Sequence, residues 1–206
     1  MESQELEILN GALGLFRCYG LKRVTMDDVA KELGISKKTI YKYFENKADL
    51  IHKIVQHVNS TIESRLIGIH LKSTNPIDEL IEIDNVVYEI VKRHNPSLSQ
   101  QLKKFYPTSY EYLYEHRNNV IHKIIAQNIE IGQRDGWYRM DACKEVIGLL
   151  YCKKVETIPE EEKKVFGNYD MNHIMGQALK YHVRGIATEK GLEYLEEKLM
   201  DTKAII

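Results

Sequence analysis

The stretch from Thr25 to Lys47, TMDDVAKELGISKKTIYKYFENK, decides the fold because it predicts two short helices joined by a tight turn. Thr25 and Asp28 have the spacing of a capping box, so we expect the first helix to begin there. Gly34 can adopt the left-handed backbone conformation that ends a helix. Ser36 is a favourable N-cap for the second helix. The stretch is therefore typical of a helix-turn-helix.

The second helix of this unit has an apolar side and a basic side. Ile40 and Phe44 lie four residues apart and are expected to face inward, which leaves lysines, tyrosines and threonine on the other faces. Between Ser36 and Lys47 there are four lysines and one glutamate, a formal charge of +3 in a chain whose net charge is −1. Lysines neutralise phosphates and hydroxyls donate to them, so this side predicts one surface for double-stranded DNA. The alternative is a solvated polar face on a small helical hairpin.

The run GISKKTIYKYFENKADL resembles the signature of the TetR (tetracycline-repressor) family of bacterial transcription regulators. The resemblance extends upstream through Leu6, Leu9, Ala12, Leu13, Phe16, Gly20 and Val24. It implies an N-terminal three-helix DNA-binding domain followed by a helical ligand-binding and dimerisation domain, which usually represses transcription until a small molecule binds. The predicted DNA-binding residues combine those that the resemblance implies with Ser36 and Lys42 from the polar side of the second helix. These are Thr25, Ser36, Lys37, Lys38, Thr39, Tyr41, Lys42, Tyr43 and Lys47.

The resemblance assigns different roles within that set. Thr25, Tyr43 and Lys47 would hold phosphates, whereas residues 37–39 and Tyr41 would lie in or beside the major groove. Lys38 departs from the family pattern, because relatives often have glycine there and so let the backbone approach DNA. We therefore expect the Lys38 side chain to reach outward.

The remaining chain is predicted to be helical, which gives an all-α fold. We expect a DNA-binding domain over residues 1–47, with the helix-turn-helix unit at 25–44, and an effector-binding and dimerisation domain over 48–206. A connector helix over 48–72 carries Leu50, Ile54 and Val58 along one side and has no flexible linker before it. Further helices are predicted from Pro76 to about Arg93 and from Thr108 to about Arg134. The segment KKVETIPEEEKKVFGNYD is predicted to be an exposed loop with a short helical turn.

Aromatic residues in the middle of the chain predict an effector pocket, because they combine ring surface with a polar tip. The candidates are Tyr88, Phe105, Tyr106, Tyr110, Tyr114 and Trp137. The alternative is that these rings fill a core. Apolar positions in the last third predict a homodimer interface built as a four-helix bundle, so that two recognition helices read a palindromic operator. They are Val146, Ile147, Leu150, Met171, Ile174, Met175, Ala178, Leu179 and His182, which would alternatively pack within one chain.

Composition narrows the class of protein. With 43% hydrophobic and 29% charged residues, the chain resembles ordinary globular proteins. No apolar run approaches the length of about 18 residues that a membrane span needs, and the acidic start lacks the features of a signal peptide, so we expect a cytoplasmic protein that associates with the nucleoid through DNA. Cys18, Cys143 and Cys152 have neither an even number nor CxxC spacing, which favours buried or idle thiols. A redox role for Cys143 and Cys152 is the alternative.

Nothing in the sequence indicates an enzyme. There is no nucleophile–base spacing, P-loop, GxGxxG or HExxH motif, so we predict no catalytic residues, metal site or cofactor. The predicted function is a dimeric DNA-binding regulator, released from its operator as a repressor by a small-molecule effector. An activator of the same architecture and an effector-independent, nucleoid-associated DNA binder are the alternatives. Effector identity, operator sequence and target genes depend on pocket shape and genomic position.

Overall fold

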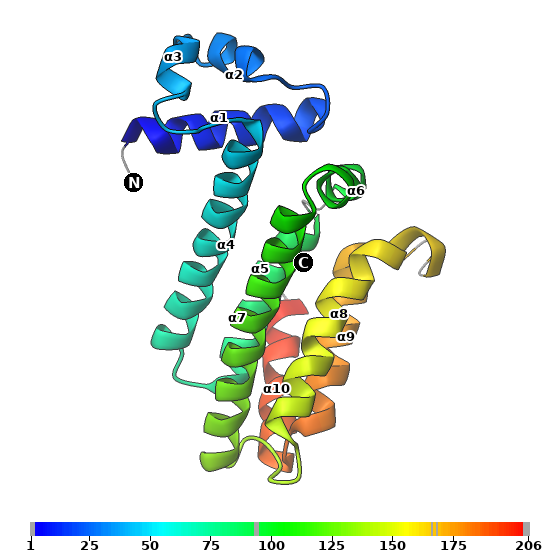
Figure 1. The fold of residues 1–206 in the computed structure, drawn as a ribbon. Coiled ribbons are helices and arrows are strands. Elements are labelled where there is room, and N and C mark those ends of the chain that lie inside the picture. Colours follow the sequence, from blue (N-terminus) through cyan, green and yellow to red (C-terminus); the bar gives the residue numbers. More distant parts are fainter. Residues whose placement is uncertain (1–2, 93–94, 166, 168, 204–206) are drawn as a thin grey trace. The chain divides into compact units, whose positions relative to one another are not determined.

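The computed structural model describes residues 3–92, 95–165, 167 and 169–203, and these residues form ten helices (Figure 1). The helices are α1 (Ser3–Tyr19), α2 (Met26–Glu32), α3 (Lys37–Ile40), α4 (Lys47–Lys72), α5 (Pro76–Lys92), α6 (Pro96–Phe105), α7 (Pro107–Arg134), α8 (Lys144–Val165), α9 (Met171–Ile186) and α10 (Glu189–Lys203). One isolated antiparallel bridge joins Tyr138 and Ala187. The predicted all-α class is confirmed. Among these described helices, none has the length and apolar character required to span a membrane.

The chain divides into two compact units. The N-terminal unit comprises Met1–Glu63 and His94–Arg117, and the C-terminal unit comprises Ser64–Arg93 and Asn118–Ile206. This division differs from the predicted boundary after Lys47, because the start of α4 shares the core of the first three helices. Leu50 and Ile51, for example, are buried in that core. The functional boundary between a DNA-binding and an effector domain stays a prediction.

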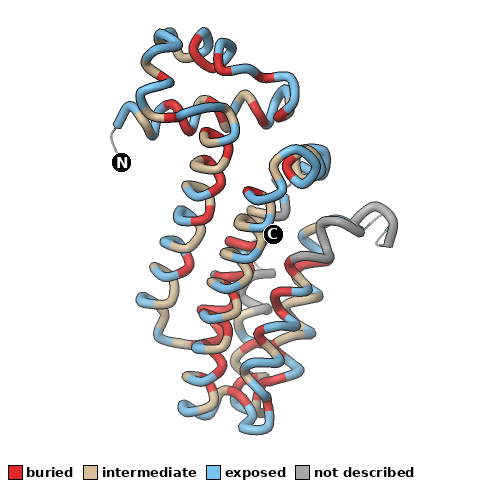
Figure 2. The backbone as a smooth tube through the Cα atoms, in the orientation of Figure 1, coloured by how far each residue is buried: buried red, intermediate tan, exposed pale blue. Residues whose placement is uncertain are grey.

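The N-terminal unit has one hydrophobic core built from amphipathic helices. Side chains spaced three and four residues apart on α1 bury one side of that helix, and α2, α3 and the start of α4 close over it. Figure 2 shows the resulting alternation of buried and exposed residues along α1 and α4. The residues at the centre of the core are Ile8, Leu9, Ala12, Phe16, Val29, Ile40, Phe44 and Leu50. Burying each large side chain contributes roughly 1.5–3 kcal/mol, which fixes the helix-turn-helix as a rigid body.

The helix-turn-helix follows from local signals that the sequence analysis identified. Thr25 and Asp28 form both hydrogen bonds of a capping box at the start of α2. Gly34 has a φ of +62°, and the following Ile35 N–H donates to the Ala30 carbonyl at 3.0 Å, which closes the turn. Gly11 on α1 was not singled out, yet a Cβ there would lie 2.6 Å from the Leu33 side chain. The Leu33 side chain therefore lies close against α1 at Gly11, and a larger residue there would displace it.

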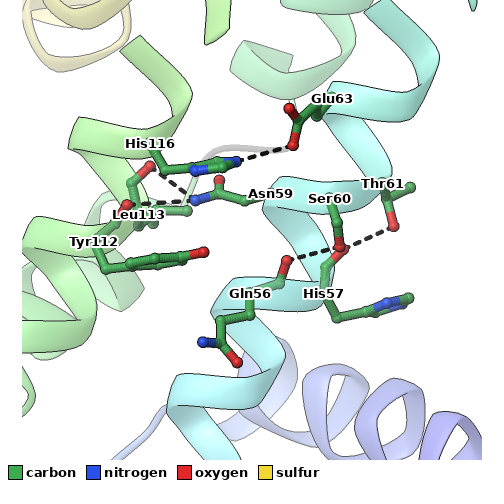
Figure 3. Close-up of polar contacts among 9 residues, drawn as sticks. All are labelled: Gln56, His57, Asn59, Ser60, Thr61, Glu63, Tyr112, Leu113 and His116. Carbon is green, nitrogen blue, oxygen red and sulfur yellow. Dashed lines mark hydrogen bonds and ion pairs between the residues drawn. The ribbon is translucent and has the colours of Figure 1, made fainter. Parts of the chain in front are cut away.

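Within the N-terminal unit, α4 and α7 are joined by polar contacts (Figure 3). The buried Asn59 amide donates to the carbonyl oxygens of Tyr112 at 3.4 Å and Leu113 at 3.3 Å. One turn along, His116 Nε2 lies 3.1 Å from a Glu63 carboxylate oxygen. These contacts hold the first part of α4 against the first part of α7, so motion of either segment is coupled to the other.

The C-terminal unit packs α5 against α8 and α9. Its core contains two buried acids, each with a partner from another helix. Glu79 accepts from the Asn128 amide at 2.9 Å, and Asp84 accepts from the Tyr151 hydroxyl at 2.9 Å. Because buried carboxylates need hydrogen-bond partners, these contacts fix the register of α5 against α7 and α8.

The prediction of an exposed loop after Lys153 was wrong as far as Val165, because α8 continues through that residue. The segment carries Pro159, which removes one backbone hydrogen bond, but it is otherwise rich in glutamate and lysine. Glutamate and lysine are residue types of high helix propensity, which favours a continuing helix. A dense run of charge is as compatible with a solvated helix as with a loop.

Candidate nucleic-acid interface

The predicted DNA-binding residues come together in the N-terminal unit. They lie at the start of α2, on α3 and the turn after it, and at the start of α4. Thr25, Ser36, Lys37, Lys38, Tyr41 and Lys42 are exposed, whereas Thr39, Tyr43 and Lys47 are partly buried. The helix-turn-helix core lies beneath them, so this surface is presented by a rigid support.

Thr25 is held in place by its own capping box. Its hydroxyl accepts from the Asp28 N–H at 3.2 Å and donates to the Asp28 carboxylate at 2.7 Å. These hydrogen bonds to Thr25 lower the pKa of Asp28. A phosphate oxygen at this position must therefore compete with Asp28 for the hydroxyl proton.

The N-cap of α3 fixes the rotamer of Thr39. The Thr39 N–H donates to Ser36 Oγ at 3.0 Å, and the two hydroxyl oxygens are 2.8 Å apart. A hydroxyl with a fixed orientation on the first turn of a recognition helix can form a hydrogen bond with a base edge or with a phosphate oxygen.

The three lysines of α3 and its following turn have different electrostatic surroundings. Lys37 Nζ lies 2.8 Å from Asp27 Oδ1, and this hydrogen-bonded pair raises the pKa of Lys37. Lys38 and Lys42 make no ion pair with any residue that the structure describes. The uncompensated positive charge of the surface therefore lies mainly on Lys38 and Lys42, and Asp27 offsets part of the charge counted from the sequence.

Tyr43 and Lys47 are supported by residues that the sequence analysis did not identify. The Tyr43 hydroxyl donates to Gln4 Oε1 at 3.1 Å, and Lys53 Nζ donates to the Tyr43 carbonyl at 2.7 Å. Burial lowers the pKa of Lys47, and the nearby Asp28 opposes that effect. Lys47 Nζ also lies 5.9 Å from the centre of the Phe16 ring. The tips of both side chains therefore contact α1, the Tyr43 hydroxyl through Gln4 and the Lys47 ammonium group through the Phe16 ring, and a DNA phosphate must compete with these contacts.

The residues predicted to line an effector pocket are divided between the two units. Phe105, Tyr106, Tyr110 and Tyr114 belong to the N-terminal unit, where the Tyr110 and Tyr114 ring centres are 4.4 Å apart. Tyr88 and Trp137 belong to the C-terminal unit. The Trp137 ring packs there against Tyr194 with ring centres 5.3 Å apart. The six residues therefore do not gather within one unit, and their role in effector binding stays a prediction.

The predicted dimer residues also have different environments. Val146 and Leu150 are 52% and 59% exposed on α8, and Leu149 adds to the same helix at 56%. Ile174 and Met175 are buried within the chain, where α9 packs on α5 and α8. The remaining members, Ile147, Met171, Ala178, Leu179 and His182, are partly buried. The apolar surface available to a second copy therefore lies mainly on α8.

Residues 8–54 match the family model described as bacterial regulatory proteins, tetR family. The chain therefore carries an N-terminal domain that matches this family. The matched segment contains the helices and the core that support the candidate interface, so the family assignment and the geometry concern the same residues.

Several relatives resemble this chain over different lengths. The nucleoid occlusion factor SlmA of Haemophilus influenzae is 28% identical over 83 residues, which cover 40% of this chain and 38% of SlmA. The chain thus spans about two fifths of the length of the curated relatives first matched. The transcriptional repressor KstR2 of Mycobacterium tuberculosis is 23% identical over 147 residues, covering 68% of this chain and 72% of KstR2.

Solved structures share the fold of this chain, KstR2 and SmeT among them. The ketosteroid transcriptional regulator KstR2 of Mycobacterium tuberculosis has a TM-score of 0.61 with 20% identity, covering 92% of this chain and 97% of that one. The SmeT–triclosan complex has a TM-score of 0.70 with 12% identity, covering 91% and 93%. The likeness extends through both units, which supports the arrangement of helices in each.

Proposed function

We propose that this chain is a homodimeric transcription regulator that binds operator DNA through α3 and the turn after it, and acts as a repressor released by a small-molecule effector. The observation that carries the proposal is the exposed pair of unpaired lysines, Lys38 and Lys42, on a capped and rigid helix-turn-helix. Such a surface neutralises phosphates while the first turn of the helix approaches base edges. The protein would act in the cytoplasm, on the chromosome.

Dimerisation is the second part of the proposal. One helix-turn-helix per chain reads one half-site, and a two-fold dimer places two of them on a palindrome. The exposed apolar side chains of Val146, Leu149 and Leu150 support a contact between α8 helices of two copies. These three residues are spaced three and four apart and so share one face of α8, and a contiguous exposed apolar patch marks an association site.

Effector control is the third part. Two similar structures support it, because KstR2 is a ketosteroid transcriptional regulator and SmeT was solved in complex with triclosan. An effector that favours one of two conformations weakens DNA binding by the ratio of its affinities for those states. Repression would follow if the operator overlaps the promoter, whereas an activator would bind upstream of it.

The experiment that tests DNA recognition is selection of bound sequences from a random duplex pool, followed by footprinting of the enriched site. We expect a palindromic site whose half-site centres are separated by about one helical turn of DNA, or a multiple of it, and two chains per site. If no sequence is enriched above its level in the starting pool, the proposal of a sequence-specific regulator is overturned.

The similarity to SlmA favours a second candidate, an effector-independent DNA binder. That similarity covers 83 residues of this chain. Titration of metabolite pools against the DNA complex distinguishes the two functions. Release of DNA by a fraction supports effector control, whereas specific DNA binding that no fraction changes supports the second candidate.

A further inference from the structure

A cleft of about 380 Å³ lies in the N-terminal unit, between the end of α1, the turn after it and α6. Its volume falls in the lower part of the range of roughly 300–1,000 Å³ that is usual for small-molecule sites. The lining residues that matter are Arg17, Cys18, Lys22, Arg23, Gln101 and Phe105.

The charge of this cleft is one-sided. Arg17, Lys22 and Arg23 line it, and no acidic residue is among the lining residues. Within the part of the chain that the structure describes, none of these three cations has an ion-pair partner. Three uncompensated like charges around one concave surface attract an anion and raise its local concentration. Arginine also matches phosphate oxygens with two parallel hydrogen bonds.

The cleft is separate from the surface formed by α3. The Tyr43 hydroxyl, just after α3, donates to Gln4 near the start of α1, whereas the cleft begins at Arg17 near the other end of that helix. Thirteen residues of α-helix separate these positions, a distance of about 20 Å. Arg17 therefore lies away from α3, whereas Arg23 stands two residues before Thr25, so a duplex-DNA probe is needed to separate the two surfaces.

The cleft also lies where two segments meet. The Lys22 N–H donates to Gln101 Oε1 of α6 at 3.2 Å. Gly20 has a φ of +84°, and a Cβ there would lie 3.0 Å from the Gln101 amide. The end of α1 and α6 are thus in direct contact beside the cations. A ligand in the cleft touches both segments at once.

We propose that this cleft binds a small phosphate-bearing anion. Arg17, Lys22 and Arg23 neutralise its charge, Ser97 and Gln101 offer hydrogen bonds, and Phe105 covers an apolar part of the ligand. The proposal does not depend on the proposed DNA-binding function, because none of these residues belongs to the proposed DNA-binding set.

The cysteines of the chain provide a direct test on the full-length protein. Cys18 lines the cleft and is exposed, whereas Cys143 is exposed in the C-terminal unit. The protein is treated with iodoacetamide in increasing pyrophosphate, and modification of each cysteine is followed by mass spectrometry. We expect saturable protection of Cys18, an unchanged rate at Cys143, and no protection by potassium chloride at matched ionic strength. Equal effects on both cysteines, or equal protection by the salt, would overturn the proposal.

Paired variants assign the protection to the cleft. Arg17→Gln with Arg23→Gln should weaken pyrophosphate protection by about tenfold, the loss expected for two exposed charge contacts. Lys72→Gln with Lys123→Gln makes the same change of net charge at exposed positions outside the cleft and should leave protection unchanged. Circular dichroism verifies that both proteins are folded. An undiminished effect of pyrophosphate on the folded arginine variant would contradict the proposal.

Two further probes fix the class of ligand. Citrate carries similar charge without phosphate geometry, and we expect it to protect Cys18 about tenfold less well than pyrophosphate. Equal protection by citrate would overturn the assignment to phosphate. Protection by duplex DNA without protection by pyrophosphate would show that the cleft contacts nucleic acid, and would also overturn it.

Discussion

Lys37 on α3 and Asp27 on α2 form an ion pair across the helix-turn-helix, with Nζ and Oδ1 2.8 Å apart. Both side chains are exposed, so the pair contributes little to folding. Its effect is on the surface that faces DNA. Asp27 holds the ammonium group of Lys37 and adds a negative charge beside the proposed phosphate contacts.

Replacing Asp27 with asparagine should therefore strengthen DNA binding. We expect about a two- to fivefold lower Kd, because Lys37 no longer has a competing carboxylate and one repulsive charge is removed. Fluorescence anisotropy with operator DNA measures the change. Asp141→Asn is the matched control, since Asp141 pairs with Arg139 in the C-terminal unit. Weaker binding by Asp27→Asn would show that Asp27 positions Lys37 productively.

Removing the Thr25 hydroxyl should lower the stability of the folded protein. Thr25→Ala loses the N-cap of α2 and should lower the free energy of unfolding by about 1 kcal/mol. Thr25→Ser keeps the cap and should retain most of the stability. Urea unfolding measures both variants, and equal stability of all three proteins would show that the capping box does not stabilise α2.

A charged residue on α8 should prevent dimerisation. Leu150→Glu places a carboxylate in the proposed interface, where an unpaired buried charge is strongly unfavourable. We expect sedimentation equilibrium to detect monomers at concentrations where the wild type is dimeric. Leu71→Glu is the control, because Leu71 is 77% exposed on α4 outside that interface. A Leu150→Glu protein that remains dimeric would place the interface elsewhere.

His182 should make the stability of the chain depend on pH. Burial, with a smaller effect of Lys154, lowers the pKa of His182 from 6.5 to about 4. Between these values the unfolded chain binds a proton that the folded chain does not, so stability falls as the pH falls. The loss is about 1.4 kcal/mol per pH unit over that window.

The measurement is urea unfolding at pH 7 and pH 5. His182→Gln should reduce the difference in stability between the two pH values. His173→Gln should not, because His173 is exposed. An unchanged pH dependence in His182→Gln would assign the effect to other groups.

The sequence was most informative where structure depends on neighbouring residues. The cap at Thr25, the turn at Gly34 and the cap at Ser36 are each specified within four residues, and all three were predicted correctly. The Lys37–Asp27 and Tyr43–Gln4 contacts were missed, since they join residues 10 and 39 positions apart through tertiary packing.

Two other features show why composition is a weaker guide. The charged end of α8 was predicted to be a loop, although glutamate and lysine suit solvated helices equally well. The aromatic residues were grouped by their closeness along the chain, but Tyr110 and Trp137 belong to different units. Positions in a pocket depend on how helices fold back on one another, which periodicity does not specify.

We propose that Lys38 on α3 and Lys42 in the turn after it bind the phosphates of operator DNA. The most direct test is the salt dependence of operator affinity for Lys42→Ala, with Lys123→Ala as the control at an exposed position of the C-terminal unit. We predict that the slope of log affinity against log salt concentration decreases by about one in Lys42→Ala and not in Lys123→Ala. An unchanged slope in Lys42→Ala would contradict the account.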